Sequence, residues 1–490
     1  MPLIKNTTLA LLLVTLCGAA LAQNITDSYR IEDIALPKNV PPEVGAVQFD
    51  SEGTLYVALR RGDILMAKPT ADPKKFEWKQ FASGFHNACG MEVIKPRHIV
   101  VSQMPELTEV RDTDGDGVAD SYTTLTDVWG VSGNYHETNE ICPDGNGGYY
   151  IAVGTASHNG PTFHHLRGEY SKIGRRGRNF SGVPWKGWVM HYAKDGTVTP
   201  FAKGFRMHNG IMRDSNGELW CGDNQGDWRA TTPFYHLKKD AFYGHPSSLV
   251  WDKDWPKGKD PLKMPLKEIN AMRTRAAVLL PHKEINRSAS EPVEIPENFG
   301  PFAGQILLPD NNSNRISRIM LDKVNGEYQG SCTHFINGHG LRSGNNRAVF
   351  TADGKTLYVG QTARGWGKPA EGLQRITWLG KTPFDIKQIK LTKTGFDLNF
   401  TKEVKLLSGS LVKLRSFRYE DKWSYGGPQL DKRDEAVSSQ RSEGKMIHLD
   451  VPKLEPGRVY HIKISGLKSK DGTPLLNQDF YYTLNQLVKN

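Results

Sequence analysis

The sequence predicts an all-β protein with a six-bladed β-propeller over residues 28–380 and a small immunoglobulin-like β-sandwich over residues 382–490. Three observations support this prediction. A hairpin unit recurs six times in the first part of the chain. The 49 Gly and 28 Pro cluster between short apolar runs, which is typical of strands joined by tight turns. The apolar pattern then changes after about residue 381.

The chain begins with a segment of the signal-peptide type. Lys5 gives a positive start, Leu9–Leu16 forms an apolar stretch, and an A-x-A cleavage sequence ends at Ala22. We therefore expect residues 1–22 to be removed and the protein to be exported, to a periplasm or to the medium. The apolar stretch is too short to span a bilayer and no later one reaches 18 residues, so we predict no membrane span.

Each copy of the repeated unit is an apolar strand, a turn rich in Asp or Gly, and a strand of aromatic and β-branched residues. The clear copies are 47–57, 141–153, 211–220 and 349–359, and degraded copies lie near 92–101 and 304–319. A hairpin cannot bury both of its faces alone, so six copies predict six blades stacked around an axis. Insertions at about 155–187 and 228–298 are expected to form the rim of a binding site.

The last part of the chain has a different pattern. Apolar and polar residues roughly alternate over 386–400, and short strand-like runs follow at 446–451, 459–464 and 480–484. This favours a small sandwich with no catalytic motif. It is interpreted as a docking module, a carbohydrate-facing module or a stabilising cap.

Charge and cysteine content narrow the partners and cofactors. The formal net charge is +10, but no nucleic-acid motif accompanies it, so we predict no nucleic-acid partner and favour an anionic polysaccharide. The four cysteines beyond the signal segment permit two disulfides or four buried thiols, and both interpretations stay open. They are Cys89, Cys142, Cys221 and Cys332. Their spacing contains no C-x-x-C-H, so no haem is predicted.

The sharpest local motif is an acidic loop of EF-hand type. Its aspartates occupy positions 1, 3, 5 and 9 of a calcium loop, Gly117 occupies position 6, and Val118 supplies the carbonyl of position 7. The aspartates are Asp112, Asp114, Asp116 and Asp120. Thr123 replaces the usual Glu at position 12, so we expect a structural calcium site of modest affinity, with a solvated acidic turn as the alternative.

A dense polar run follows the third clear repeat. Asp223, Asn224 and Asp227 precede Trp228, and strand ends in a propeller line its funnel. Carboxylates and amides there could hold a hard cation such as Ca²⁺, or Asp223 and Asn224 could simply cap a turn.

Two further groups of residues are candidates for chemistry. His136 beside Glu137 could supply a general base, because the pKa of histidine lies near neutral pH, or His136 could be structural. Arg342, Arg347 and Gln361 flank the last clear repeat. Guanidinium groups there would suit an acidic cofactor or substrate, although about half of such arginines bind loop carbonyls instead.

These residues carry a resemblance. The run GFRMHNGIMRDSNGELW resembles a blade of the glucose/sorbosone dehydrogenase family, soluble six-bladed propellers that use pyrroloquinoline quinone (PQQ). GNYHE, DNQGDW, FYGHPSSL and GQTARGWG are similar to a subgroup of exported propellers from Planctomycetes, Verrucomicrobia and Bacteroidetes that is named after this family. The resemblance covers essentially the whole mature chain.

The resemblance implies a site as well as a fold. It implies a quinone held by arginines and Ca²⁺, oxidation of a sugar or polysaccharide-derived substrate, and electron transfer to a separate cytochrome or small acceptor. Carried onto this chain, the catalytic candidates are His136, Glu137 and His208. The cofactor-binding candidates are Arg206, Asn209, Asp223, Asn224, Asp227, Trp228, Arg342, Arg347 and Gln361. The family's R-N-P corner reads Arg206-Met207-His208 here, which is a departure at the site itself.

Two other functions fit the same residues. One is a calcium-dependent lactonase or polysaccharide-active propeller with a cation at the hub and no quinone. The other is a non-catalytic glycan-binding protein, favoured by the sandwich and the basic rim.

Overall fold

The computed structural model describes residues 23–132, 139–157, 167–176, 179–362, 370–405 and 411–489. The predicted signal segment 1–22 and the predicted base His136 with Glu137 lie outside these residues.

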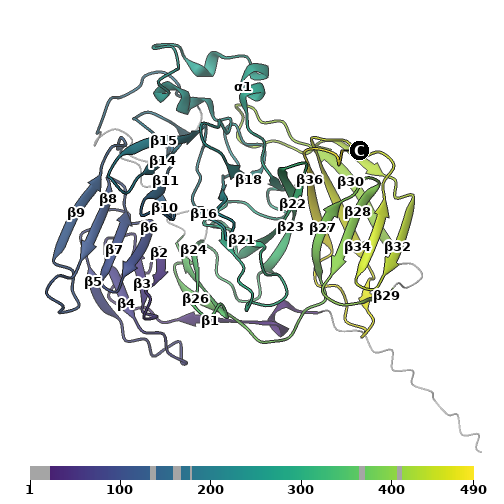
Figure 1. The fold of residues 1–490 in the computed structure, drawn as a ribbon, viewed down its shortest axis with the longest axis horizontal. Helices are drawn as coiled ribbons and strands as arrows, with labels where there is room; N and C mark the ends of the chain where they lie inside the picture. The colour runs from purple at the N-terminus through teal and green to yellow at the C-terminus, as the bar shows by residue number, and fades with distance from the viewer. Residues whose placement is uncertain are drawn as a thin grey trace, which may run out of the picture.

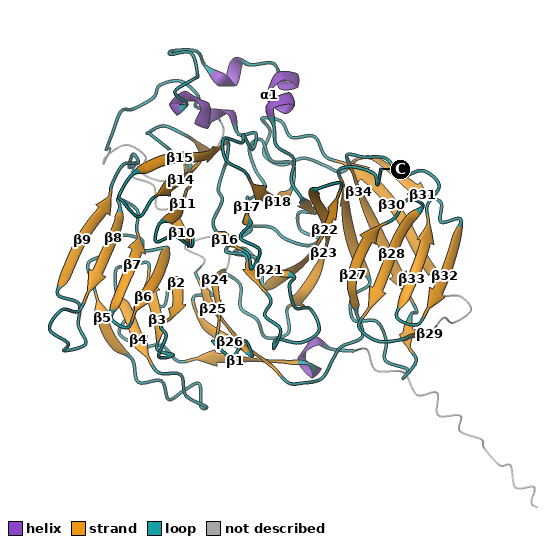
Figure 2. Ribbon diagram, in the orientation of Figure 1, coloured by secondary structure: helices purple, strands orange, loops and turns teal. Residues whose placement is uncertain are grey.

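Strands are the main regular structure of the described chain, and loops join them (Figure 2). The first part of the chain contains five four-stranded antiparallel sheets and the first four strands of an eight-stranded sheet, which counts as the fifth sheet in chain order. Within each sheet, neighbouring strands pair in the order that follows. The first three are β2 (Val44–Phe49), β3 (Leu55–Leu59), β4 (Ile64–Ala67) and β5 (Lys79–Ala82); β6 (Gly90–Lys95), β7 (His98–Ser102), β8 (Leu107–Arg111) and β9 (Ser121–Thr126); and β10 (Asn139–Pro143), β11 (Tyr149–Val153), β14 (Trp188–Tyr192) and β15 (Val198–Lys203).

The fourth sheet consists of β16 (Ile211–Arg213), β17 (Leu219–Gly222), β18 (Thr232–Leu237) and β19 (Val278–Leu280). The fifth starts with β20 (Val293–Glu294), β21 (Ile306–Pro309), β22 (Arg315–Val324) and β23 (Glu327–Asn337). The sixth contains β24 (Asn345–Phe350), β25 (Thr356–Gln361), β26 (Gly372–Trp378) and, from the start of the chain, β1 (Tyr29–Ile34). The first strand thus completes the last of the six sheets.

The sheets follow one another around a common centre, as the blades of a propeller do (Figure 1). The inner strand β2 contacts both β6 and β24, β6 contacts β10, and β10 contacts β16. Gly210, just before β16, lies against Ser290 and Glu291, just before β20. The starts of the inner strands therefore lie close together at one end of the sheets.

The repeats predict the hairpins well, with one correction. Five copies coincide with the inner and second strands of their sheets, because each tight turn joins two strands rich in apolar residues. The copy at 304–319 is one strand out of step, since it forms β21 and β22, the second and third strands of its sheet. The inner strand there is the two-residue β20, which is too short to give an apolar pattern.

The last part of the chain forms two sheets around one apolar core. One contains β27 (Ile386–Leu391), β28 (Gly395–Phe400), β33 (Met446–Asp450) and β32 (Ser439–Glu443); the other contains β36 (Asp479–Leu484), β34 (Arg458–Ser465), β30 (Leu411–Arg418) and β31 (Leu430–Glu435). We call this part the C-terminal sandwich. Because β36 also pairs with β23, its second sheet continues into the fifth sheet of the first part. An immunoglobulin-like topology stays a prediction.

The remaining elements are short. Two small ladders pair β12 (Ala156–Ser157) with β13 (Asn179–Phe180) and β29 (Val404–Lys405) with β35 (Lys468–Ser469). The helical segments are η1 (Ile25–Asp27), η2 (Pro246–Trp251), η3 (Pro261–Lys263) and α1 (Leu266–Met272). The last three lie between β18 and β19, at the top of Figure 1, over a small apolar cluster that includes Trp228. The predicted insertion 228–298 is therefore too long, because the sheet strands β18, β19 and β20 lie within it.

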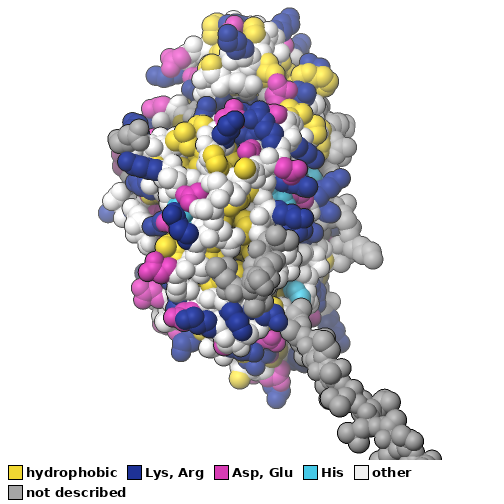
Figure 3. Space-filling model, turned by 90° about the vertical axis from the view of Figure 1, so that its right-hand side faces the viewer, with side chains coloured by type: hydrophobic (Ala, Val, Ile, Leu, Met, Phe, Trp, Pro, Cys, Tyr) yellow, Lys and Arg dark blue, Asp and Glu magenta, His cyan; other side chains and the backbone are white. Residues whose placement is uncertain are grey.

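The structure also bears on the predictions about disulfides, basic surface charge and membrane-spanning segments. All four cysteines in the described chain are separate, buried thiols. On the face shown in Figure 3, Lys and Arg are interspersed with Asp and Glu and form no single basic patch. Within the described ranges, no helix has both the length and the apolar character needed to cross a bilayer.

Candidate functional site

Charged side chains from four sheets converge at the starts of the inner strands. Glu92 lies on β6, Glu140 on β10 and Arg347 on β24, while Glu291 immediately precedes β20. The charges of Glu92, Glu291 and Arg347 all act on Glu140, which places the four side chains within electrostatic reach of one another. We call Glu92, Glu140, Glu291 and Arg347 the channel cluster.

Arg347 joins the inner strands of this cluster. Only 1% of it is exposed, and it forms an ion pair with Glu140. Its Nε donates to the carbonyl of Cys89 at 2.7 Å, and its Nη1 donates to the carbonyl of Asn209, also at 2.7 Å. Asn209 in turn donates from Nδ2 to Oδ1 of Asn346 at 2.9 Å. Two predicted cofactor residues, Arg347 and Asn209, therefore meet here, largely bound to the protein itself.

Burial holds the carboxyls of the cluster close to their neutral form. It raises the pKa of Glu92 to about 7, and the negative charge of Glu291 adds to the effect. Burial also raises the pKa of Glu291 to about 7, although the positive charge of Arg347 and the N–H of Ala348 oppose it. The pKa of Glu140 is raised well above its ordinary value by the same cause. Carboxyls that titrate near neutral pH are able to give and accept protons.

Asp223 organises the loops around the start of β16. Its Oδ2 accepts from the N–H of Arg206 at 2.9 Å, and its Oδ1 accepts from the N–H of Met207 at 2.7 Å. The Nε of Arg229 donates to Oδ2 at 2.9 Å, and Asp223 has no exposed surface. These bonds satisfy both oxygens within the protein, so the structure gives Asp223 a loop-capping role and not the cation-binding role that the resemblance implies.

The fifth sheet repeats this arrangement. Asp310 follows β21 as Asp223 follows β17, and it is also fully buried. It accepts from the N–H groups of Arg287 at 2.8 Å and Ser288 at 3.1 Å, in the loop that leads to its own inner strand. An Asp that follows the second strand therefore caps the loop into the first strand in both the fourth and the fifth sheets.

Three predicted site residues point elsewhere. His208 is fully buried, stacks on Phe205 and contacts the carbonyl of Trp188 at 3.0 Å. Burial lowers its pKa to about 4, so it is a neutral core histidine and not an accessible base. Arg342 binds Asp33 of the outermost strand β1 at 3.0 Å, away from the channel cluster. Trp228 packs into the apolar cluster below α1 with Ile269.

Arg206 lies in the loop that enters β16, the first strand of the fourth sheet. It is 5% exposed, and its Nε lies 3.9 Å from Oδ2 of Asp227. Its guanidinium also lies 5.1 Å from the ring centre of Tyr425 in the C-terminal sandwich. The buried His245 lies within the electrostatic influence of Arg206, and burial holds the pKa of His245 far below its usual range.

Buried polar atoms without hydrogen-bond partners gather at this end of the sheets. Among the described residues they include Arg206 Nε, Asn224 Oδ1, both ring nitrogens of His245, Arg347 Nη2 and Gln361 Oε1. The starts of inner strands and the ends of second strands adjoin in antiparallel sheets, which explains the gathering. Buried polar groups are normally paired, so these atoms indicate a place for a polar ligand.

The acidic loop folds as a compact turn between β8 and β9. Carboxylate oxygens of Asp112, Asp114 and Asp116 all lie within 4.8 Å of one another. Asp112 accepts from the N–H of Gly115 at 2.6 Å. Asp120 instead accepts from the N–H and the hydroxyl of Thr113. Three of the four predicted aspartate ligands therefore come together, and the fourth, Asp120, closes the loop.

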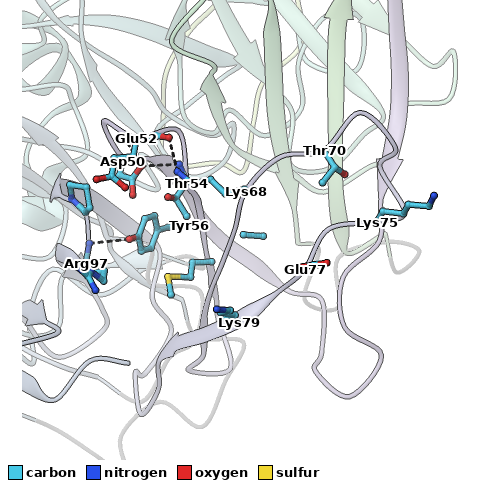
Figure 4. A pocket seen from close by; sticks show the side chains of 13 residues that line it. Asp50, Glu52, Thr54, Tyr56, Lys68, Thr70, Lys75, Glu77, Lys79 and Arg97 are labelled. Carbon is cyan, nitrogen blue, oxygen red and sulfur yellow. Dashed lines mark hydrogen bonds between the residues drawn. The ribbon is translucent and has the colours of Figure 1, made fainter. Parts of the chain in front are cut away.

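A pocket of about 420 Å³ adjoins this loop (Figure 4). Tyr56 forms part of its wall and accepts a hydrogen bond from the N–H of Arg97 at 3.0 Å. The side chain of Arg97 reaches Asp112 of the acidic loop at 3.4 Å. None of the predicted cofactor residues lines this pocket.

Sequence reasoning missed Glu92, Glu140 and Glu291. Each follows the loop that enters an inner strand, so aligning the six repeats by their turns would have drawn attention to them. Their burial could not be predicted, because an isolated Glu in a strand pattern usually faces solvent.

Comparison with known proteins supports the fold. A structure of the holo form of the pyranose dehydrogenase PQQ domain from Coprinopsis cinerea is similar, with a TM-score of 0.52 and 15% identity over 74% of this chain and 99% of that chain. A calcium structure of the Trichoderma reesei Carbohydrate-Active Enzymes Family AA12 gives a TM-score of 0.51 and 10% identity over 72% of this chain and 96% of that chain. The likeness is one of fold.

Two sequence comparisons add to this. A family model described as a domain of unknown function, DUF7133, matches residues 69–287, less than half of the chain. A search of curated proteins found no match.

Proposed function

We propose that this chain is an exported enzyme that oxidises a sugar or sugar derivative, with PQQ and calcium as cofactors. The observation that carries the proposal is the gathering of unpaired buried polar atoms and of carboxyls titrating near neutral pH at one end of the six sheets. The shared fold with a pyranose dehydrogenase PQQ domain supports it.

The described residues suit a quinone that carries carboxylates. Among the described residues, Arg206 Nε and Arg347 Nη2 have no hydrogen-bond acceptor. Asn224 directly follows Asp223, which caps the nearby loop. Guanidinium groups bind carboxylates well, so Arg206 and Arg347 would hold the cofactor. When bound, PQQ supplies a two-electron acceptor for the sugar.

The protein's own residues would handle protons and position. Glu92 and Glu291 can take up a proton near neutral pH, and Arg347 anchors the strands that carry the site. His136, which is outside the described residues, is the base that the resemblance implies. Calcium would stabilise the acidic loop through Asp112, Asp114 and Asp116.

The proposal also covers the organisation of the chain. Residues 1–22 would be the export signal, 28–380 a closed six-bladed propeller, and 382–490 an immunoglobulin-like sandwich. The completion of the sixth sheet by β1 supports the closed propeller. Electrons would pass to a separate cytochrome or small acceptor.

Reconstitution tests this function. Purified protein is incubated with PQQ and Ca²⁺, and reduction of an artificial dye is measured with a panel of sugars. We expect cofactor-dependent turnover, which Arg206→Ala lowers while the exposed Arg415→Ala does not. Absence of both PQQ binding and turnover across the panel would overturn the proposal.

One observation favours a second candidate, a non-catalytic glycan-binding protein. Arg347 contacts Glu140 and donates to the carbonyls of Cys89 and Asn209, which leaves fewer of its N–H groups for an anionic cofactor. In that case glycans bind without PQQ and no turnover is seen.

A further inference from the structure

A hairpin loop of the C-terminal sandwich packs against the fourth sheet, on the segment that follows β17. Residues 419–429 connect β30 to β31 and reach the segment that follows β17. Trp228 donates its N–H to the carbonyl of Lys422 at 2.9 Å, and Gly426 donates its N–H to the carbonyl of Gly226 at 3.0 Å. We call residues 419–429 the sandwich loop.

Charged groups fix the sandwich loop in the same place. Oδ1 of Asp421 accepts from the N–H of Ala230 at 2.7 Å, and Oδ2 of Asp421 lies 3.1 Å from the guanidinium of Arg273. Gly426 has a φ of +68°, and a Cβ there would lie 2.5 Å from Nε2 of Gln225. The positive φ favours a glycine at this position. The loop is a built contact between the two parts of the chain.

The sandwich loop exposes two aromatic side chains. Trp423 is 52% exposed and Tyr425 is 53% exposed, which places them among the most exposed large hydrophobic residues in the described chain. Both lie against arginines of the first part. The guanidinium of Arg176 lies 4.0 Å from the ring centre of Trp423, and that of Arg206 lies 5.1 Å from the ring centre of Tyr425.

This arrangement has the properties of a sugar-binding platform. Cation–π contacts hold each ring in orientation, while about half of each residue's surface remains accessible. Aromatic rings present an apolar face that packs against the C–H groups of a pyranose, and the exposed Arg176 beside Trp423 can donate to its hydroxyl or carboxylate oxygens. Arg206 is shared with the candidate site, so the platform and that site are adjacent.

We propose that Trp423 and Tyr425 form a subsite for a sugar ring of an oligosaccharide whose end enters the candidate site. The inference rests on the proposed function for the identity of the substrate as a carbohydrate. It assigns the C-terminal sandwich a direct part in substrate recognition and predicts that oligosaccharides bind more tightly than monosaccharides.

Binding measurements without PQQ test the subsite. An array of neutral and uronate-containing oligosaccharides of four or more sugar units is probed with the wild type, Trp423→Ala and Tyr425→Ala, and hits are titrated by calorimetry. We expect each variant to bind at least about tenfold more weakly than the wild type, and the monosaccharides of the same hits to bind weakly to all three proteins. Tyr122→Ala is the matched control, because Tyr122 is 46% exposed on the distant strand β9.

The outcomes separate this inference from the proposed function. Oligosaccharide binding that depends on Trp423 and Tyr425 supports the subsite even if PQQ gives no turnover. Equal binding by the wild type and both variants, or no binding to any glycan on the array, overturns the subsite even if dehydrogenase activity is found. Thermal unfolding of each variant is measured as well, and Trp423→Phe should restore part of the binding, which a merely folding-related defect would not explain.

Discussion

Arg229 donates from Nε to Oδ2 of Asp223 at 2.9 Å, and at most 1% of either residue is exposed to solvent. Arg229 also donates from Nη2 to the carbonyl of Gly204 at 2.6 Å. The pair thus joins the segment after β17 to the loop that enters β16. Because Asp223 also accepts from the N–H of Arg206, the pair fixes the backbone that carries Arg206.

The first prediction concerns this pair. Asp223→Asn leaves Arg229 without its counter-charge and turns an amide N–H₂ toward backbone donors, so we expect a loss of about 3–5 kcal/mol in the free energy of unfolding. Denaturant unfolding measures it, with the exposed turn variant Asp195→Asn as a control that should change little. An Asp223→Asn protein of unchanged stability that no longer binds Ca²⁺ would show that Asp223 is a metal ligand instead.

The second prediction concerns calcium. Because Asp112, Asp114 and Asp116 lie within 4.8 Å of one another, we expect about 10 mM Ca²⁺ to stabilise the protein by about 1–3 kcal/mol and a chelator to remove the effect. Thermal unfolding with and without Ca²⁺ measures it. The double variant Asp114→Asn with Asp116→Asn should show no response, and Mg²⁺ at the same concentration should have a smaller effect on the wild type. A calcium response that survives in the double variant would place the ion elsewhere.

The third prediction concerns pH and Glu92. Its pKa is about 7 in the folded protein and near the ordinary value of 4.5 when unfolded, so the folded state binds the proton more tightly between these two values. The stabilising contribution of Glu92 is complete below about pH 4.5 and is lost as the pH rises through 7. Relative to the wild type, Glu92→Gln should therefore gain up to about 3 kcal/mol in stability between pH 4.5 and 8.

The comparison must be differential because other groups titrate in the same range. The pKa values of the buried His208 and of the partly buried His282 and His334 are lowered to about 4, so the effect of these histidines on stability has the opposite sign. Both proteins contain these histidines, and their contribution cancels in the difference. If the stability of the wild type and of Glu92→Gln changes with pH in parallel, Glu92 is ionised in the folded protein at every pH between 4.5 and 8.

The fourth prediction concerns the boundary between the two parts. Arg318 on β22 donates from Nη2 to Asp385, just before β27, at 2.7 Å, and both side chains are buried. Together with the pairing of β23 with β36, this predicts a single unfolding transition for the whole chain in calorimetry. Asp385→Asn should lower the free energy of unfolding by about 3–5 kcal/mol. Glu403→Gln, which breaks an exposed pair with Lys470, should change the free energy of unfolding little. Two separate transitions would show that the sandwich unfolds independently.

Much of the fold could be predicted because its signals are local. A turn with Asp144 and Gly145 between two apolar runs predicts the hairpin of β10 and β11 without any knowledge of the neighbouring sheets. The same holds for the acidic loop, whose aspartates lie within a few residues of one another. The fifth repeat was misaligned because β20 has only two residues, so its position depends on contacts with the adjoining sheets.

The candidate site was harder to predict because its contacts join distant segments. Arg347 meets Glu140 and the carbonyls of Cys89 and Asn209 only when the inner strands converge. Asp223 looked like a ligand in a polar run, but its oxygens are occupied by the loop around Arg206. The contact of Arg206 with Tyr425 joins parts of the chain that no local pattern connects.

The sequence by itself determined the β-strands, the turns, the recurrence of the hairpins and the acidic loop, since each depends on residues close together in the chain. Tertiary structure alone decided which side chains share the channel cluster, which histidine is sealed in the core, and which aromatic rings lie beside Arg206. The physical reason is that burial and electrostatic pairing, which set the protonation and partners of a side chain, are properties of the assembled sheets.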